Sequence, residues 1–163
     1  MPARLPLFAL VAALFSAGML AGAYLFELVG GYAPCRMCYW QRWAHWAVLA
    51  GAGVAVVVPR PGARLGALLV PGALAVSAGL GAYHAGVEYG WWTGPRSCSG
   101  GGASLEGLDP GAILGGLDAP LAAVDCAAAP WSLGLSMAGW NAVLSLGALV
   151  VVIALVRTKG VRA

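Results

Sequence analysis

Charged residues are scarce in this chain. Asp, Glu, Lys and Arg make up 9% of its 163 residues, hydrophobic residues make up 61%, and the mean hydropathy is +0.83. A soluble domain carries about a quarter charged residues, because its surface faces water. The scarcity excludes an ordinary soluble enzyme and predicts a single integral membrane domain over residues 1–163.

Motifs for several common functions are also missing from the sequence. It contains no internal repeat, no basic patch suited to nucleic acid and no glycine-rich loop suited to phosphate. We therefore expect membrane lipid around the protein and no nucleic-acid partner.

Long apolar runs account for most of the chain. A helix rises 1.5 Å per residue and needs roughly 20 apolar residues to cross the hydrocarbon core. Four runs meet this length, the second only when its aromatic residues back to Tyr39 are counted. They predict an all-α bundle of four transmembrane helices over about residues 5–26, 41–58, 65–86 and 133–156. Small residues in these runs predict close helix–helix contacts at Gly18, Gly22, Gly79 and Gly147.

We expect the first apolar run to be retained as a helix rather than cleaved as a signal peptide. Its 22 uncharged residues, Leu5–Phe26, exceed the usual apolar region of a signal peptide, about 7–15 residues. Its removal would also leave three spans and place the two chain ends on opposite sides of the membrane.

The charged residues are distributed unequally among the segments that connect the spans. The two termini and the connection at residues 59–64 carry six basic residues and no acidic residue. The other two loops carry three basic and six acidic residues. Because cytoplasmic segments carry an excess of Lys and Arg, we expect both termini in the cytoplasm and these two loops outside.

The second outer loop, about residues 87–131, is long and rich in Gly, Ala, Pro and Ser. Loops of this length are usually functional or lack regular structure. Irregularly spaced leucines between residues 105 and 121 predict a short helix lying on the membrane surface.

Aromatic residues gather in the outer half of the predicted bundle. Of the 15 Phe, Tyr and Trp residues, only Phe8 and Phe15 fall near the inner half. Interfacial anchoring explains such a belt. A flat apolar ligand held near the outer surface explains it equally well.

All four cysteines fall in the two outer loops. An even number confined to an oxidising face predicts two disulfides. A zinc site also needs four ligands, but 27 residues separate the later two cysteines, and an oxidising compartment disfavours free thiolates, so we expect no metal. The four residues are Cys35, Cys38, Cys98 and Cys126.

The Cys35–Cys38 pair lies where the second span begins. The free N–H groups of a helix start favour an anionic sulfur, and Arg36 and Arg42 add positive charge nearby. These features should lower a cysteine pKa below its usual value of about 8.5. Because a stabilised thiolate favours the reduced form, the disulfide should be a strong oxidant that needs an electron outlet.

A quinone in the bilayer would provide that outlet. Its ring is flat and apolar, which suits contact with Trp43 and Trp46, and its oxygens need a donor such as Arg42 or His84. Simpler roles remain open for the same residues: a structural disulfide, an interfacial anchor for Arg42 and a hydrogen-bonded helix end for His84. We assign packing to His45 and an interhelical hydrogen bond to Asn141, the latter because polar side chains bond across spans.

The second pair, Cys98 and Cys126, lies in the long loop, where a soluble protein could reach it. The pair could simply brace the loop. It could also exchange with a partner's thiols and with Cys35, since exchange needs accessible sulfurs and a mixed disulfide.

Two motifs resemble the disulfide bond formation protein B (DsbB) family. They are PCRMCYWQR, from Pro34 to Arg42, and YHAGVEYGWWTGPRSC, from Tyr83 to Cys98, followed by a later lone cysteine. The resemblance implies a multi-pass protein of the bacterial inner membrane. Such a protein reoxidises a periplasmic DsbA-like thioredoxin-fold protein and passes two electrons to ubiquinone or menaquinone.

The resemblance also implies individual roles. Cys98 would form the mixed disulfide with the partner, and the released Cys126 would attack Cys35. Cys38 would be the thiolate at the quinone, with Arg42 beside a quinone oxygen and His84 close by at the outer end of the third span. Arg36 and Met37 replace the apolar pair often found inside this motif, which leaves the redox potential open.

Two other functions remain as alternatives. Proteins similar to vitamin K epoxide reductase have a comparable bundle, but in them the loop pair precedes the CxxC motif, whereas here the CxxC motif comes first. A non-enzymatic membrane scaffold would use the same disulfides only to brace its outer loops.

Overall fold

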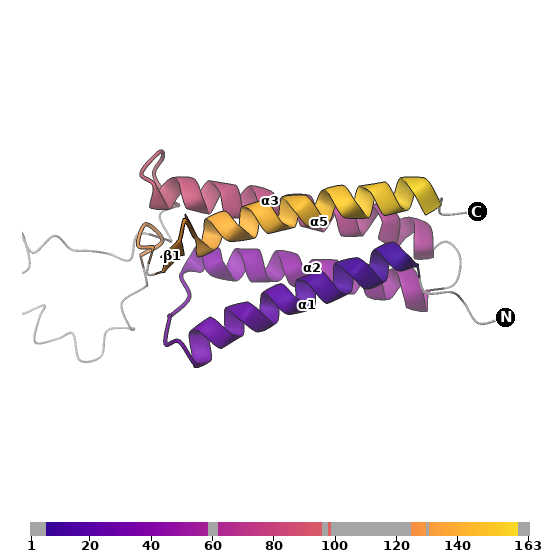
Figure 1. The fold of residues 1–163 in the computed structure, drawn as a ribbon, viewed down its shortest axis with the longest axis horizontal. Helices are drawn as coiled ribbons and strands as arrows, with labels where there is room; N and C mark the ends of the chain where they lie inside the picture. The colour runs from indigo at the N-terminus through magenta and orange to yellow at the C-terminus, as the bar shows by residue number, and fades with distance from the viewer. Residues whose placement is uncertain (1–5, 59–61, 96–97, 99–124, 130, 160–163) are drawn as a thin grey trace, which may run out of the picture.

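Four long helices lie side by side in the computed structural model, which describes residues 6–58, 62–95, 98, 125–129 and 131–159 (Figure 1). They are α1 (Leu7–Leu28), α2 (Arg36–Val57), α3 (Gly62–Glu88) and α5 (Met137–Lys159). The predicted helical bundle is therefore confirmed for these segments. The surface helix predicted between residues 105 and 121 lies outside the described residues.

Three of the helices, α1, α3 and α5, are long and apolar enough to cross a membrane, and the chain is a multi-pass membrane protein. Helix α2 has the same length as α1, 22 residues, but it contains Gln41, Arg42 and His45, all buried. These polar side chains lower the hydropathy of α2, and all three line a cavity between the helices.

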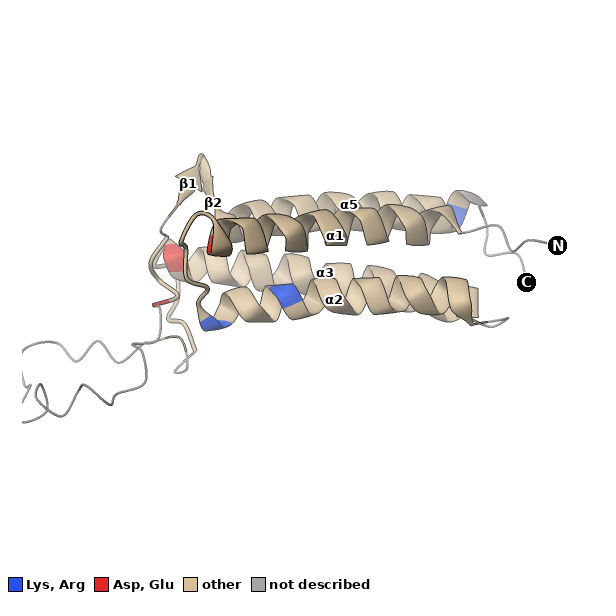
Figure 2. Cartoon of the chain, turned by 90° about the horizontal axis from the view of Figure 1, so that it is seen from below, with Lys and Arg blue, Asp and Glu red and all other residues tan. Residues whose placement is uncertain are grey.

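Both ends of the described chain lie at the same end of the bundle (Figure 1). The described acidic residues lie at the opposite end, together with the hairpin (Figure 2). They are Glu27, Glu88 and Asp125. Arg64 lies in the first turn of α3 and Arg157 in the last turn of α5, at the end that bears the termini (Figure 1). Acidic groups and cysteines therefore share one end of the molecule.

Helices α2 and α3 approach each other closely through glycines. A Cβ atom added to Gly66 would overlap with Ala55, and one added to Gly51 would lie 3.2 Å from Cβ of Leu69. The prediction of close contacts at Gly18, Gly22, Gly79 and Gly147 is wrong, because a Cβ atom there would meet nothing within 4 Å. Spacing along the sequence does not show which face of a helix meets a neighbour.

Two clusters of buried residues fill the bundle. The cluster toward the termini is apolar and includes Phe8, Val48, Leu74 and Val152. The cluster at the opposite end consists of Cys35, Met37, Val87, Cys98 and Cys126. Four sulfur-bearing side chains therefore form part of the packed core at the hairpin end.

A short hairpin precedes the last helix, where the sequence predicted a helix from residue 133. Strands β1 (Ser132–Leu133) and β2 (Leu135–Ser136) pair antiparallel around Gly134, whose φ of +73° suits the turn. The hydroxyl of Ser136 then accepts a hydrogen bond from the N–H of Gly139 at 3.1 Å. Because this bond satisfies a free N–H group of the first helical turn, α5 begins at Met137.

Candidate functional site

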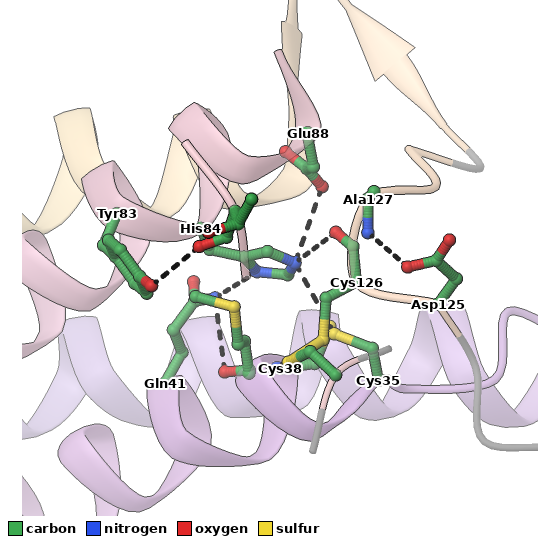
Figure 3. The surroundings of a disulfide bond; sticks show 12 residues. Cys35, Cys38, Gln41, Tyr83, His84, Glu88, Asp125, Cys126 and Ala127 are labelled. Atoms are coloured by element: carbon green, nitrogen blue, oxygen red, sulfur yellow. Dashed lines mark hydrogen bonds and ion pairs between the residues drawn. A yellow bond between two sulfur atoms is a disulfide. The ribbon is translucent and has the colours of Figure 1, made fainter. Parts of the chain in front are cut away.

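Cys35 and Cys38 form a pair of free thiols at the start of α2 (Figure 3). Cys35 is the N-cap residue in extended conformation, and its Sγ accepts the N–H of Cys38 at 3.3 Å. The two Sγ atoms lie 2.9 Å apart and share a hydrogen bond. The helix start therefore holds the sulfurs together in the dithiol form.

These contacts lower the pKa of the Cys35 thiol from 9.0 to about 4. The main cause is the hydrogen bond from Cys38, which outweighs the opposing effect of burial, and His84 lowers the pKa further. The lowered pKa that the motif predicts therefore falls on Cys35. Its donors are the backbone and thiol of Cys38 together with His84, rather than Arg36 or Arg42.

The second pair is joined by a disulfide between Cys98 and Cys126, whose Cα atoms lie 5.2 Å apart. The N–H of Cys126 donates to the carbonyl oxygen of Cys98 at 3.3 Å. Both residues are buried beside Cys35 and Val87. Of the two predicted disulfides, the structure contains this one, and it packs directly against the free pair.

The imidazole of His84 connects the two pairs. Its Nε2 atom lies 3.5 Å from Sγ of Cys35 and 3.2 Å from the carbonyl oxygen of Cys126 (Figure 3). The side-chain amide of Gln41 donates to Nδ1 at 2.8 Å, so the proton of the neutral ring resides on Nε2. That N–H group can donate to either neighbour. Oε1 of Glu88 lies 3.8 Å from the same Nε2 atom.

Arg42 is buried on the same helix, one turn beyond Cys38. Its guanidinium is paired with the carboxylate of Glu27 and donates to the carbonyl oxygen of Ala23 at 3.2 Å. It also lies over the ring of Tyr24, 4.7 Å from the centroid. These contacts from α1 fix the guanidinium and balance its charge, which a buried charge requires.

A cavity of about 350 Å³ lies between the helices at this end and is lined mostly by apolar atoms. This volume is within the range of sites for small organic ligands, ~300–1,000 Å³. Its polar lining on the cysteine side includes Cys35, Cys38, Gln41, Arg42, His84, Glu88 and Asp125. The free thiols of Cys35 and Cys38 therefore open onto an apolar cavity within the helical bundle.

Comparison with protein families matches residues 5–155 to the family described as disulfide bond formation protein DsbB. The chain belongs to the DsbB family. It is therefore a membrane protein that takes part in disulfide bond formation, and its family consists of oxidoreductases. No curated protein and no solved structure matches the chain.

The structure brings most of the predicted DsbB site together. Cys35, Cys38, Arg42 and His84 line one cavity, and the Cys98–Cys126 disulfide packs beside it. Trp43 and Trp46 do not line this cavity and are 70% and 47% exposed on α2. Two other tryptophans, Trp131 and Trp140, line it instead.

Four charged or polar residues of this DsbB site were not predicted: Glu27, Gln41, Glu88 and Asp125. Helical spacing could have indicated two of them, because Gln41 follows Cys38 by three residues and Glu88 follows His84 by four. Glu27 lies on a different helix from Arg42, and the sequence carries no signal for that pairing.

Cys35, Cys38 and His84 place their ligand atoms within 4.8 Å of one another, a set that suits a thiophilic cation. A structural zinc site needs four ligands, and the described residues supply these three. The hydrogen bonds among the three side chains account for their proximity in the dithiol state.

Proposed function

We propose that this DsbB-family protein oxidises a periplasmic, DsbA-like thioredoxin-fold protein and passes the two electrons to a membrane quinone. One observation carries the proposal: a dithiol with an acidic Cys35 lines an apolar cavity and packs against a second disulfide. The family match favours this activity over a vitamin K epoxide reductase-like one.

The proposal places the protein in the bacterial inner membrane with its cysteine end toward the periplasm. The basic residues of the termini and of the connection at 59–64 support this orientation. Disulfides also persist on the oxidising side of the membrane.

Electrons enter at the loop pair. A partner thiolate attacks Cys98, which breaks the Cys98–Cys126 bond, and the released Cys126 attacks Cys35 of an oxidised Cys35–Cys38 pair. Cys38 leaves as a thiolate. The partner's second thiol then releases Cys98, which attacks Cys126 and frees Cys35. The partner gains a disulfide, the loop disulfide is restored, and Cys35 and Cys38 are left as a dithiol.

The sulfur connectivity of the structure matches this last stage, with Cys98–Cys126 bonded and Cys35 and Cys38 free. His84 is well placed for the internal exchange, because its Nε2 atom lies near both Cys35 and Cys126. The attack on Cys98 requires displacement of its segment, since Cys98 is buried.

Electrons leave through the cavity. Ubiquinone and menaquinone both present a planar apolar ring with two carbonyl oxygens, and the cavity offers an apolar lining with a few polar groups. When bound, a quinone accepts two electrons and two protons. Cys38 supplies the reacting sulfur, and Arg42 supplies positive charge beside a quinone oxygen. In this proposal Trp43 and Trp46 face lipid at the boundary of the bundle.

The test is quinone reduction by a reduced thioredoxin-fold partner, measured for the wild type, Cys38→Ser and a Ser132→Ala control on the exposed hairpin. We expect Cys38→Ser to abolish quinol formation and Ser132→Ala to retain it. Full turnover by Cys38→Ser would favour a scaffold with structural disulfides.

A further inference from the structure

A second group of polar side chains is buried deeper in the bundle, at a point where four helices meet. Its members are all less than 10% exposed and come from α1, α2, α3 and α5: Ser16, His45, Ser77, Asn141 and Ser145. Polar groups at this depth are costly, and in membrane proteins they commonly mark a ligand path or an interhelical hydrogen bond.

His45 and Asn141 are the centre of this cluster. Nε2 of His45 lies 2.9 Å from Oδ1 of Asn141, and Nδ1 lies 3.2 Å from the hydroxyl of Ser16. The amide nitrogen of Asn141 donates to the carbonyl oxygen of Ser77 at 3.2 Å and to its hydroxyl at 3.3 Å. The imidazole therefore fixes the orientation of the Asn141 amide.

These two residues also line the cavity that contains the thiols, whereas the three serines do not. Cys38, Gln41 and His45 are spaced by three and four residues, so they follow one face of α2. The rise of an α-helix places His45 about 10 Å beyond Cys38 along its axis. The cavity thus has polar groups on the cysteine side and again at its deep end, with Leu20 and Leu144 among the apolar residues of its wall.

The second N–H of Asn141 can donate to a ligand oxygen in place of the Ser77 hydroxyl without leaving a buried group unpaired. Its second bond, to the Ser77 hydroxyl, is long at 3.3 Å. That hydroxyl also lies 3.1 Å from the hydroxyl of Ser145 and 3.2 Å from Nε2 of His45. Exchanging this long bond for one to a ligand would therefore cost little, because the Ser77 hydroxyl keeps its other partners.

We propose that the amide of Asn141, oriented by His45, donates a hydrogen bond to the second carbonyl oxygen of a para-quinone whose first carbonyl faces Cys38. This inference rests on the proposed function and adds a binding subsite at the deep end of the cavity. It predicts a preference for ligands with carbonyl oxygens at opposite ends of a flat ring. Asn141 is then a binding residue, and His45 is a positioning residue.

The wild-type chain offers a direct test, because it contains one asparagine and one glutamine, Asn141 and Gln41. Uniform ¹⁵N labelling therefore gives two side-chain amide groups in an NMR spectrum. Addition of decylubiquinone should shift an amide proton of Asn141 in a saturable manner, and a dimethoxytoluene without carbonyls should not reproduce that shift. An Asn141 signal that stays in place at saturating decylubiquinone would overturn the proposal.

Kinetics provide a second test with a matched control. Asn141→Leu should raise the apparent KM for decylubiquinone about five- to tenfold, the loss of one hydrogen bond, with little change in the rate of thiol exchange between the two cysteine pairs. Ser132 is exposed on β1 and does not line the cavity, so the KM of Ser132→Ala should equal that of the wild type. Equal KM values for both variants would also overturn the subsite.

The two proposals fail in different ways. If the wild type forms no quinol from decylubiquinone, the proposed function is wrong and the proposed subsite is wrong as well. If the wild type forms quinol while Asn141→Leu has the same KM as Ser132→Ala and the wild-type Asn141 amide signal does not shift with decylubiquinone, only the subsite is wrong.

Discussion

The imidazole of His84 contacts both cysteine pairs. It contacts Cys35 through Nε2, accepts from Gln41 through Nδ1 and reaches the carbonyl oxygen of Cys126. Cys35 in turn accepts hydrogen bonds from the backbone and thiol of Cys38. Reactivity at this site therefore depends on a small set of directed contacts rather than on the general positive charge of Arg36 and Arg42.

The acidity of Cys35 leads to a pH prediction. Because its folded pKa of about 4 lies below the ordinary value of 9.0, the thiolate stabilises the folded reduced protein fully above pH 9.0 and progressively less as the pH falls toward 4. We expect the ultraviolet absorbance of one thiolate per reduced chain to persist down to about pH 4. Cys38→Ala should raise the pKa of Cys35, since it removes the principal donor. A wild-type transition near pH 9 would contradict this assignment.

Arg42 and Arg36 provide a matched pair of arginines on α2. Arg42 is buried and lines the cavity, whereas Arg36 is exposed. We expect Arg42→Ala to raise the apparent KM for quinone about tenfold, because a hydrogen bond from a charged group is lost. Steady-state quinol formation measures the effect, and Arg36→Ala should behave as the wild type. Equal KM values would mean that Arg42 only anchors α2 to Glu27.

At the scale of helices, the contact between α2 and α3 positions the site. This contact brings Cys35 and Gln41 within reach of His84. It depends on Gly66, where a Cβ atom would overlap with Ala55. A change in this packing would alter the geometry of the site from a distance.

Alanine substitutions at two glycines of α3 test this packing. Gly66→Ala should destabilise the protein by about 1–3 kcal/mol through overpacking. Gly79→Ala should be neutral or stabilising by up to about 1 kcal/mol, because its Cβ meets nothing and alanine favours the helix. Thermal denaturation in detergent measures both. Equal loss of stability in the two variants would contradict the contact.

The sequence predicted the helices well, because long apolar runs determine them directly. It missed the β1–β2 hairpin, because the apolar run of the last span already begins at residue 133, whereas the chain turns at Gly134 before α5 begins. It found Cys35, Cys38, Arg42 and His84 from motif spacing and resemblance. It did not find the cavity role of Glu88 or the ion pair of Glu27, since such contacts depend on how separate helices face one another.

At the scale of the whole molecule, the bundle separates two environments. The end that bears the termini is closed by an apolar core, whereas the opposite end contains the cysteine sulfurs, the described acidic residues and the cavity. Within the proposed function, the thiols of a water-soluble partner deliver electrons at this end. Cys38 then passes them to a lipid-soluble quinone bound in the cavity. The loop disulfide and the free pair are packed together where these environments meet.

A single-turnover experiment measures this transfer most directly. Protein with Cys35 and Cys38 reduced and Cys98–Cys126 bonded is mixed with decylubiquinone without oxygen, and quinol and free thiols are counted over time. We predict one quinol for each Cys35–Cys38 disulfide formed, with the Cys98–Cys126 bond unchanged. Quinol that forms while Cys35 and Cys38 remain free thiols, or no quinol at all, would contradict the account.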